Sequence, residues 1–448
     1  MALTGIEIFK FLPKTNCGEC GVPTCLAFAM KLAARQVELA ECPYVSEQAK
    51  ATLEEAAAPP IRVVSIGSGG DVCKVGGETV LFRHEKTFIN PPGIAVQITD
   101  AMSDEEVSTR LKHYAELQYE RVGLTLKPDL VAIKSANGDA SNMGALVKKA
   151  KDAGVKKFIL ISRKADVLSA ALTHCADDRP LLYAADKENI DSLGALAKEK
   201  NCPLAVCGGN LDEARDLIEK LTAMGLKDLV IDSGARTLKQ LFQDQVAIRR
   251  SALSNVRALG FPTITFPCEM TSDPMKETLI AGTLVAKYAG IIVLSDLQGH
   301  SLFPLLVERM NIYTDPQRPM ATTEGIYEIN NPTADSPLII TSNFSLTYFI
   351  VSGEVESSRV PCWLLIKDTE GLSVLTGWAA GKFVADAIGP FVKKCGIGEK
   401  IRHKTLVIPG AAAAISGELE EELPGWNIKI GPREAAYLAP YLKSWTAA

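Results

Sequence analysis

The chain contains the run Leu130-Val131-Ala132-Ile133-Lys134, a short apolar segment that ends in a charged residue. Similar runs recur through the middle of the chain, and segments with helical periodicity, such as 211–224 and 237–259, lie between them. Short, nearly continuous apolar runs are typical of buried parallel strands. The strand candidates are 94–98, 130–134, 158–162, 181–185, 204–207, 229–232, 263–266 and 291–294.

These eight successive β–α units are the number found in a TIM (β/α)8 barrel, so we predict a central barrel over residues 93–315. A large doubly wound sheet gives the same local pattern and is the alternative. In a barrel, the polar residues that follow the strands would lie at the carboxyl end, where active sites are usually found. These residues are Asn137, Asp139, Arg163, Asp186, Asn210, Asp232, Ser233, Glu269 and Asp296.

Proline-containing segments separate the predicted barrel from the rest of the chain. A first block, 1–57, ends in the linker Glu54–Pro60, whose paired prolines cannot continue a helix. Residues 58–92 are interpreted as linker and β-hairpin or small meander. In this stretch Gly67-Ser68-Gly69-Gly70 predicts a turn, because no Gly-Lys-Ser/Thr follows as in a phosphate-binding loop. Residues 316–337, rich in Pro, Thr and Asn, predict a second linker.

The last block, 338–448, again alternates strand and helix patterns and predicts a small doubly wound α/β domain with an open parallel sheet. Its expected strands are 338–341, 363–367, 405–408 and 428–430. Its expected helices are 346–353, 379–394, 411–423 and 433–445.

Composition excludes several classes of protein. A length of 448 residues exceeds what one hydrophobic core usually serves. The net charge is −5 with both signs interspersed, which argues against a nucleic-acid or anionic-membrane surface. Charged residues in the first twenty positions disfavour a secretory signal, and the longest apolar runs are interrupted by Pro and Gly. We therefore expect a cytoplasmic protein with no nucleic-acid or membrane partner.

Four of the eleven cysteines, Cys17, Cys20, Cys25 and Cys42, lie within 26 residues, whereas the other seven are scattered. Scattered free cysteines are usually small buried hydrophobic residues. A cubane cluster needs four converging thiolates, and a Cys-x2-Cys loop with nearby glycines supplies two of them. Zinc also accepts four thiolates, but zinc ribbons usually pair two such loops. The spacing favours a 4Fe–4S cluster, with zinc as the alternative.

The segment from Asn16 to Ala29 resembles the amino-terminal cluster domain of the corrinoid iron–sulfur protein large subunit, the gamma subunit of CO dehydrogenase/acetyl-CoA synthase complexes. The resemblance covers the whole chain in the order cluster domain, barrel and small α/β domain. The last of these contains Leu375–Phe383 and Pro409–Ala413, which also match the family. The resemblance implies a 4Fe–4S cluster on the four cysteines and a cobamide in the carboxy-terminal domain.

The expected strand ends of the last domain fit this implied cofactor. Ligands of open α/β sheets bind outside the carboxyl ends of the strands, and short side chains there let a flat ring approach the backbone. Because helix N-termini also suit phosphates, the residues alone would favour a nucleotide. The expected cobamide contacts are Thr341, Ser342, Asn343, Thr347, Gly371, Leu372, Ser373, Val374, Leu375, Thr376, Gly377, Ala379, Gly381, Lys382, Phe383, Pro409, Gly410, Ala411, Gly431, Pro432, Arg433 and Glu434.

None of the five histidines lies in the Asp-x-His-x-x-Gly motif with which many cobamide domains place a histidine beneath cobalt. The resemblance therefore implies a base-off cofactor with little axial ligation, and Thr376 is the residue expected beneath the cobalt. Weak axial donation makes low-valent Co(I) easier to reach.

The function implied by the resemblance is that of a methyl carrier in the reductive acetyl-CoA (Wood–Ljungdahl) pathway. Co(I) would accept a methyl group from methyltetrahydrofolate on a separate methyltransferase, and methyl-Co(III) would pass it to acetyl-CoA synthase. The cluster would supply the electron that reactivates Co(II). The implied partners are a smaller subunit in a heterodimer, the methyltransferase and acetyl-CoA synthase/CO dehydrogenase.

Two other functions stay open from the sequence. The barrel could itself be a pterin-dependent methyltransferase, with Asn210 and Asp232 as the residues to test. The competing interpretation is that the polar strand ends solvate loops or contact a partner subunit. A plain ferredoxin-like electron-transfer module would explain the cysteines but would leave most of the chain without a role.

Overall fold

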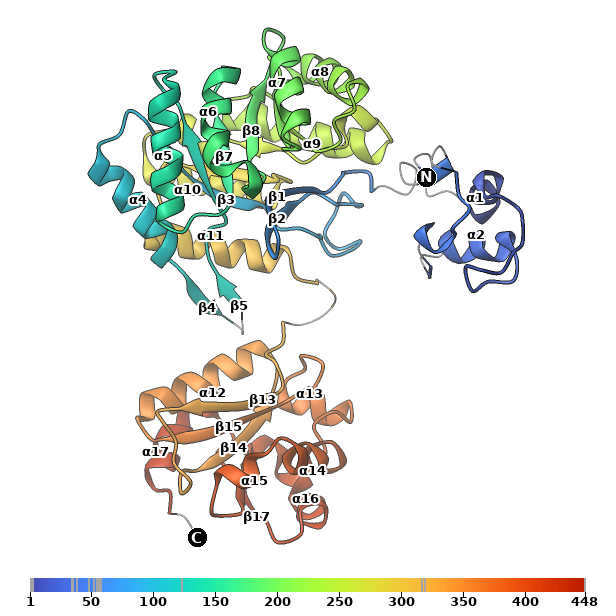
Figure 1. The fold of residues 1–448 in the computed structure, drawn as a ribbon. Helices are drawn as coiled ribbons and strands as arrows, with labels where there is room; N and C mark the ends of the chain where they lie inside the picture. The colour runs from blue at the N-terminus through green and yellow to red at the C-terminus, as the bar shows by residue number, and fades with distance from the viewer. Residues whose placement is uncertain are drawn as a thin grey trace. The chain divides into compact units, whose positions relative to one another are not determined.

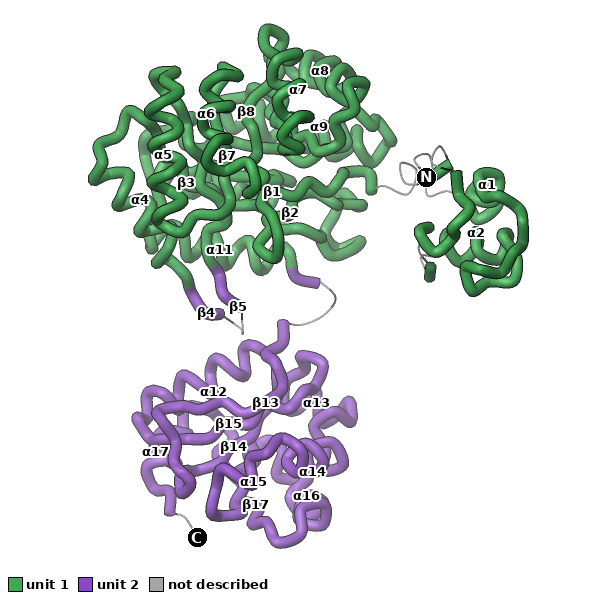
Figure 2. Tube along the Cα trace, in the orientation of Figure 1, with its two compact units in different colours: residues 1–118, 127–313 green, residues 119–126, 314–448 purple. Residues whose placement is uncertain are grey.

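The computed structural model describes residues 4–33, 36–37, 39–46, 49–50, 53, 59–121, 124–315, 317 and 320–446. These residues form two compact units (Figure 2), and residues 119–126 group with 314–448 rather than with the rest of the barrel sequence. Most of the predicted linker Glu54–Pro60 lies outside the described residues. No helix in the described ranges has the length and apolar character needed to cross a bilayer.

The cysteine-rich segment forms two short helices, α1 (Gly5–Phe11) and α2 (Cys25–Ala33), and a 3-10 turn, η1 (Leu39–Glu41). Thr4 and Glu7 form a reciprocal capping box that satisfies the first N–H groups of α1. Ile8 of α1 and Phe28 of α2 lie in a small apolar core of their own. This core is the scaffold on which the cysteines are placed.

Strands β1 (Val64–Ser68) and β2 (Asp71–Val75) form an antiparallel hairpin, which confirms the predicted turn between them. A meander that continues beyond the hairpin is not observed, because residues 78–82 form no strand. Apolar side chains of the hairpin, including Val64 and Val75, belong to the same core cluster as the inward-facing residues of the barrel strands. The hairpin therefore packs against the barrel interior.

The central barrel is confirmed. Its eight parallel strands have the order β10-β9-β8-β7-β6-β3-β12-β11, and a parallel bridge between Ile231 and Thr263 nearly closes the sheet. Ile231 N–H donates to the carbonyl of Pro262 at 2.8 Å at this closure. The strands are β3 (Gly93–Thr99), β6 (Leu130–Lys134), β7 (Phe158–Ile161), β8 (Leu181–Ala185), β9 (Leu204–Cys207), β10 (Leu229–Asp232), β11 (Ile264–Thr265) and β12 (Ile291–Leu294).

Each barrel strand is followed by a helix on the outside of the barrel (Figure 1). Several polar residues at the strand ends cap these helices, as Asp139 does for α5 and Asn210 for α8. The helices are α4 (Asp104–Glu116), α5 (Ala140–Asp152), α6 (Ala165–Cys175), α7 (Ile190–Glu199), α8 (Leu211–Ala223), α9 (Leu238–Leu253), α10 (Pro274–Ala286) and α11 (Gly299–Ile312). Short 3-10 turns η2 (Ala176–Asp178), η3 (Arg257–Leu259) and η4 (Pro267–Glu269) complete this region.

The carboxy-terminal domain is built on a five-stranded sheet of order β13-β15-β14-β16-β17, in which only β13 is antiparallel to its neighbour. Its strands are β13 (Gly325–Ile329), β14 (Leu338–Ser342), β15 (Cys362–Lys367), β16 (Thr405–Ile408) and β17 (Asn427–Ile430). A separate two-stranded hairpin, β4 (Tyr119–Arg121) and β5 (Leu124–Leu126), groups with this unit.

Helices cover both faces of this sheet. Helices α12 (Ser345–Ser358) and α17 (Leu438–Lys443) pack on one face. The other face is covered by α13 (Val374–Ala379), α14 (Ala385–Lys394), α15 (Ile397–Lys400), η5 (Gly410–Ile415) and α16 (Ser416–Glu422), and η6 (Ala435–Tyr437) precedes α17. The expected doubly wound arrangement of this domain is therefore observed.

Three predictions for this domain are wrong. The segment 316–337 is not simply a linker, because it contains β13, which pairs with β15. The helix expected at 379–394 begins only at Ala385, because α13 ends at Ala379 and Gly381 has a φ of +70° that a right-handed helix does not allow. The helix expected at 433–445 is also shorter than expected, because the 3-10 turn η6 covers Ala435–Tyr437 and α17 begins at Leu438; this is a third difference from the prediction.

Arg309 of α11 ties the last barrel helix to the entries of the first two strands. Its guanidinium donates to the carbonyls of Pro92 at 2.9 Å and Lys127 at 3.1 Å and pairs with Asp129. Asp129 in turn accepts from Ile94 N–H at 2.9 Å. We predict that Arg309→Met lowers the free energy of unfolding by about 3 kcal/mol, because it leaves Asp129 without its counter-charge.

Chemical denaturation of the two proteins measures this change, with Arg215→Met on the exposed side of α8 as the control, since exposed ion pairs contribute little. An Arg309 variant as stable as the control would contradict the assigned role.

Candidate functional site

Three of the four predicted cluster ligands share one apolar core. Cys25 and Cys42 are buried in it, Cys20 is half-buried against it, and Cys17 is exposed in the preceding loop. Asn16 joins this loop to α2, since its side-chain oxygen accepts from Cys25 N–H at 2.8 Å. Its own backbone N–H points at the Cys25 sulfur, 3.4 Å away. The fold therefore joins the loop that contains Cys17 to the first residue of α2, and places Cys20, Cys25 and Cys42 in one small core.

The donor chemistry of this segment fits an iron–sulfur cluster. Four thiols supply the ligand set of a cubane, and a backbone N–H directed at sulfur is the kind of hydrogen bond that tunes cluster potentials. Within the described residues, no three His, Cys, Asp or Glu side chains stand close enough together to hold a metal ion.

A contact that the sequence analysis missed connects the two halves of this motif. The Tyr44 hydroxyl donates to the Glu19 carboxylate at 2.9 Å, which ties the residues after Cys42 to the Cys17–Cys20 loop. This hydrogen bond and the negative charge of Glu19 raise the pKa of Tyr44. The two residues are 25 positions apart in sequence, so no local sequence pattern predicts their contact.

The scattered cysteines behave differently. Cys73, Cys175, Cys202 and Cys362 are buried, as expected, whereas Cys207, Cys268 and Cys395 are only half-buried. Burial raises the pKa of Cys73 to about 12 and that of Cys202 to about 11. Thiols of this kind stay protonated at neutral pH and are poor metal ligands.

The carboxy-terminal domain contains a cavity of about 430 Å³ at the carboxyl edge of its sheet. The chain passes from β14 through α12 to β15 on one side, and then returns to β16 on the other side of β14. Helices therefore leave the strand ends in opposite directions between β14 and β16, which is the position where doubly wound sheets bind ligands. The cavity lies at this switch point, with Thr341 of β14 and Ile408 of β16 in its wall.

Half of the expected cobamide contacts line this cavity, and they come from every strand end around the switch point. These residues are Thr341, Thr347, Ser373, Val374, Leu375, Pro409, Ala411, Gly431, Pro432, Arg433 and Glu434. The walls also contain apolar residues that the sequence analysis missed, namely Ile339, Ile340, Ile350, Val351, Val407, Ile408, Ala435 and Leu438. Alternation along β14 and one face of α12 could have identified Ile339, Ile350 and Val351.

The other expected contacts do not line the cavity. They are Ser342, Asn343, Gly371, Leu372, Thr376, Gly377, Ala379, Gly381, Lys382, Phe383 and Gly410. Phe383 is fully buried in the core under α14, and Thr376 is exposed with its hydroxyl 3.0 Å from that of Ser373. Gly410 allows the backbone to pass close to the cavity-lining residue Gly431, because a Cβ at Gly410 would lie 2.5 Å from the carbonyl oxygen of Gly431.

Asn343 has a positioning role. Its side-chain oxygen accepts from Thr369 N–H at 3.0 Å, the Thr369 hydroxyl at 2.9 Å and Gly371 N–H at 3.0 Å. Its amide nitrogen donates to Asp368 at 2.8 Å. Asn343 is only 4% exposed, so these bonds are shielded from water. They fix the loop after β15 that leads into Ser373–Leu375 at the cavity wall.

Comparisons with known proteins agree with this architecture. A family model described as the CO dehydrogenase/acetyl-CoA synthase delta subunit matches residues 63–442, and a second, described as "Putative Fe-S cluster", matches residues 12–44. The chain is 43% identical over 445 residues to the corrinoid/iron-sulfur protein large subunit of Moorella thermoacetica, covering 99% of each protein. The chain belongs to this family.

More distant relatives of the family cover nearly the same length. The acetyl-CoA decarbonylase/synthase complex subunit gamma of Methanopyrus kandleri is 35% identical over 456 residues, covering 98% of this chain and 97% of the relative. Among solved structures, dihydropteroate synthase from Anaplasma phagocytophilum covers 49% of this chain at 12% identity with a TM-score of 0.36, a similarity too low to support a functional inference. The resemblance noted from the sequence is thus confirmed at the level of the family.

The carboxyl end of the barrel in this chain contains a network of paired charges. Arg236 makes a two-pronged contact with Asp232, with nitrogen–oxygen distances of 2.9 and 3.1 Å. Tyr183 donates to the same carboxylate at 2.6 Å, and burial, together with the Asp232 charge, raises the pKa of this tyrosine. Arg236 also bonds Glu269 at 2.7 Å, and Lys134 bonds that carboxylate at 2.8 Å. Asp232, which is 1% exposed, is therefore already satisfied by protein groups.

Other polar residues expected at this end serve the fold locally. Asp139 and Asn210 cap helices, as described above. Ser233 accepts from Ala235 N–H at 3.4 Å, and Asp296 accepts from Leu297 N–H at 2.7 Å. Asp186 pairs with Arg163 at 2.5 Å. Local roles of this kind favour the interpretation that these residues support loops.

We predict that Asn343→Ala releases the loop after β15. The substitution leaves the N–H groups of Thr369 and Gly371 without their acceptor, so amide exchange at residues 369–373 should accelerate by about 10- to 100-fold, as expected for a loss of roughly 1.5 to 3 kcal/mol. Hydrogen–deuterium exchange on cofactor-free protein measures this directly. The neighbouring Ser342→Ala is the matched control, because the Ser342 hydroxyl has no hydrogen-bond partner among the described residues. Equal exchange in both variants would contradict the role.

We also predict that the full-length chain alone shows no saturable binding of methyltetrahydrofolate below about 1 mM, because Arg236 already occupies the Asp232 carboxylate. Isothermal titration with the wild type, Asp232→Asn and the matched Asp186→Asn checks this. Tight binding that only Asp232→Asn abolishes would instead support a pterin-dependent methyltransferase in the barrel.

Proposed function

We propose that this chain is a corrinoid methyl carrier with one 4Fe–4S cluster on Cys17, Cys20, Cys25 and Cys42 and one cobamide in the carboxy-terminal domain. The observation that carries the proposal is the cavity at the switch point of that domain, in a chain that matches, from end to end, a protein named for both cofactors. When bound, the cobamide supplies the cobalt that carries the methyl group, and the cluster supplies electrons that restore it.

The walls of the cavity support a large, mostly apolar ligand. Ile339, Ile350 and Val407 give apolar contact, whereas Arg433 and Glu434 supply polar groups at one wall. The cavity is open on one side, so part of a large cofactor can extend beyond it. Leu375, 55% exposed, and Trp378, 46% exposed, offer apolar surface on α13 for that part.

The wall loops keep these groups in place before the cofactor arrives. Asn343 fixes the loop that leads to Ser373, and the close approach of Gly410 to Gly431 fixes the opposite side. Thr376 stays our candidate for the residue beneath the cobalt, since it is exposed beside the cavity-lining residue Leu375. A hydroxyl that does not donate strongly to cobalt agrees with weak axial ligation.

The cluster segment is suited to electron delivery. Cys17 and Cys20 are at least partly accessible, so electrons can enter and leave near the surface, while Cys25 and Cys42 anchor the motif in its core. We propose a smaller subunit, a methyltetrahydrofolate methyltransferase and acetyl-CoA synthase/CO dehydrogenase as partners. The names of the relatives support membership of such a complex.

We predict that Cys20→Ser impairs the role of the cluster and leaves the role of the cobamide unchanged. One ligand fewer should destabilise the cluster. Reactivation of oxidised cobalt by a low-potential protein donor should then slow by about 100-fold or more, equivalent to about 2.7 kcal/mol or more in barrier height. Methyl acceptance after chemical reduction should match the wild type, because the cobamide site is untouched. Stopped-flow absorption of the corrin measures both rates.

Cys395→Ser is the control for this experiment, since Cys395 is a half-buried thiol far from the cluster motif in sequence. The proposal would fail if Cys20→Ser reactivated at the rate of the control.

A further inference from the structure

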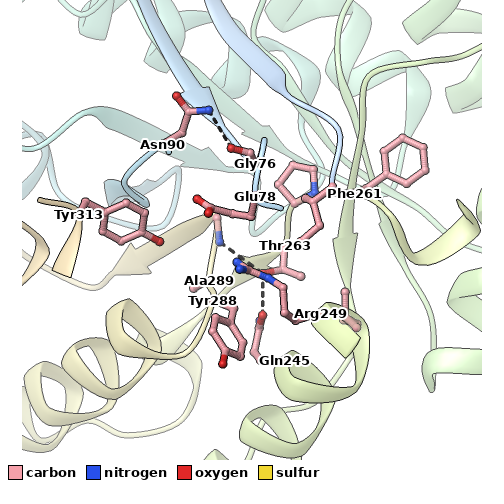
Figure 3. Close-up of a pocket in the computed structure, with 14 residues that line it drawn as sticks. Gly76, Glu78, Asn90, Gln245, Arg249, Phe261, Thr263, Tyr288, Ala289 and Tyr313 are labelled. Atoms are coloured by element: carbon pink, nitrogen blue, oxygen red, sulfur yellow. Dashed lines mark hydrogen bonds between the residues drawn. The ribbon is translucent and has the colours of Figure 1, made fainter. Parts of the chain in front are cut away.

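The amino end of the barrel contains a small polar cavity that has no part in the proposed function. It is lined by residues that precede the strands, such as Thr263 and Gly290, by the segment after the β1–β2 hairpin, and by α9 (Figure 3). Its volume is about 20 Å³, which is room for one water molecule and no larger ligand. Two side chains that carry a charge at neutral pH in water, Glu78 and Arg249, line it, together with Tyr288 and Tyr313.

Glu78 is 3% exposed, and only one of its two carboxylate oxygens is satisfied. Its Oε1 accepts from Ile89 N–H at 3.0 Å, whereas its Oε2 is buried without a hydrogen-bond partner. Burial raises the pKa of Glu78. A buried carboxylate oxygen left in this state costs about 1–3 kcal/mol or more.

Arg249 of α9 is also 3% exposed and is held in place by several contacts. Its Nη1 donates to the carbonyl of Val80 at 3.0 Å, and its guanidinium lies over the rings of Tyr288 and Phe88, 4.4 and 5.4 Å from their centroids. Its Nε is buried without a hydrogen-bond partner. Burial lowers the pKa of Arg249. The aromatic contacts fix the guanidinium, so Nε cannot turn freely toward another acceptor.

The two unsatisfied atoms are chemically complementary. Nε–H is a donor and Oε2 is an acceptor, and Figure 3 shows both side chains reaching toward the same space. A water molecule can accept from the first and donate to the second, and a polar cavity of this size with two such partners meets the requirements for a buried water. Gln245, whose Oε1 already accepts from the Thr263 hydroxyl at 2.9 Å, also lines the cavity.

We propose that the cavity is a binding site for a single structural water that bridges Arg249 Nε and Glu78 Oε2. The water completes a link between α9 and the segment that leads from the hairpin into β3. Through this link, the segment on which Glu78, Val80 and Phe88 lie is joined to the barrel.

A high-resolution crystal structure of the full-length protein tests the proposal. We expect one ordered water within about 3.2 Å of both atoms. A direct contact between Glu78 and Arg249, an empty cavity, or a buffer solute in place of water would overturn it.

Substitution gives a second, independent measurement. Glu78→Met removes the acceptor, and we expect the water to be lost and Tm to fall by about 3–6 °C. The matched control is Glu85→Met, an exposed residue on the same segment whose carboxylate accepts from Phe82 N–H, for which we expect a change below about 2 °C. Retention of the water in Glu78→Met, or equal Tm values for the two variants, would also contradict the proposal; if Glu78→Met does not fold, the wild-type structure decides alone.

Discussion

The reversal of strand order at β14, whose parallel neighbours β15 and β16 lie on opposite sides of it, is the constraint on which the proposed cofactor site depends. A right-handed connection places α12 on one face when the chain moves to β15, and the return to β16 places α13 and α14 on the other. Helix α12 therefore lies on the opposite face of the sheet from α13 and α14, so the carboxyl edge between β14 and β16 stays open. The cavity is a consequence of topology, and the side chains around it decide what it can hold.

Two cavities at the amino and carboxyl ends of the barrel are much smaller, with volumes of about 20 and 40 Å³. At its carboxyl end Asp232, Arg236, Glu269 and Lys134 neutralise one another through short hydrogen bonds. At its amino end the β1–β2 hairpin packs against the interior. Because these side chains already bond one another, they have few free donors or acceptors for a substrate. This agrees with our proposal that the barrel is a scaffold and that the two terminal segments hold the cofactors.

The barrel strands were predictable because buried parallel strands form short apolar runs that alternate with helical patterns, although a doubly wound sheet gives the same local pattern. Strand β13 was missed because it is a partly exposed edge strand within a segment rich in Pro, Thr and Asn. For the candidate site, the loops at the strand ends were predictable, but the sequence did not show which loop residues line the cavity and which support the loops or the core. Asn343, one of the expected cofactor contacts, holds the loop after β15, and Phe383 lies in the apolar core. The Tyr44–Glu19 contact depends on tertiary folding that no local pattern encodes.

Metal analysis with an absorption spectrum of anaerobically purified, corrinoid-reconstituted protein tests the central claim most directly. Our account predicts about four iron atoms and about one cobalt atom per chain, with iron–sulfur and corrin absorption in the same protein. Zinc in place of iron, or a chain that takes up no corrinoid, would contradict it.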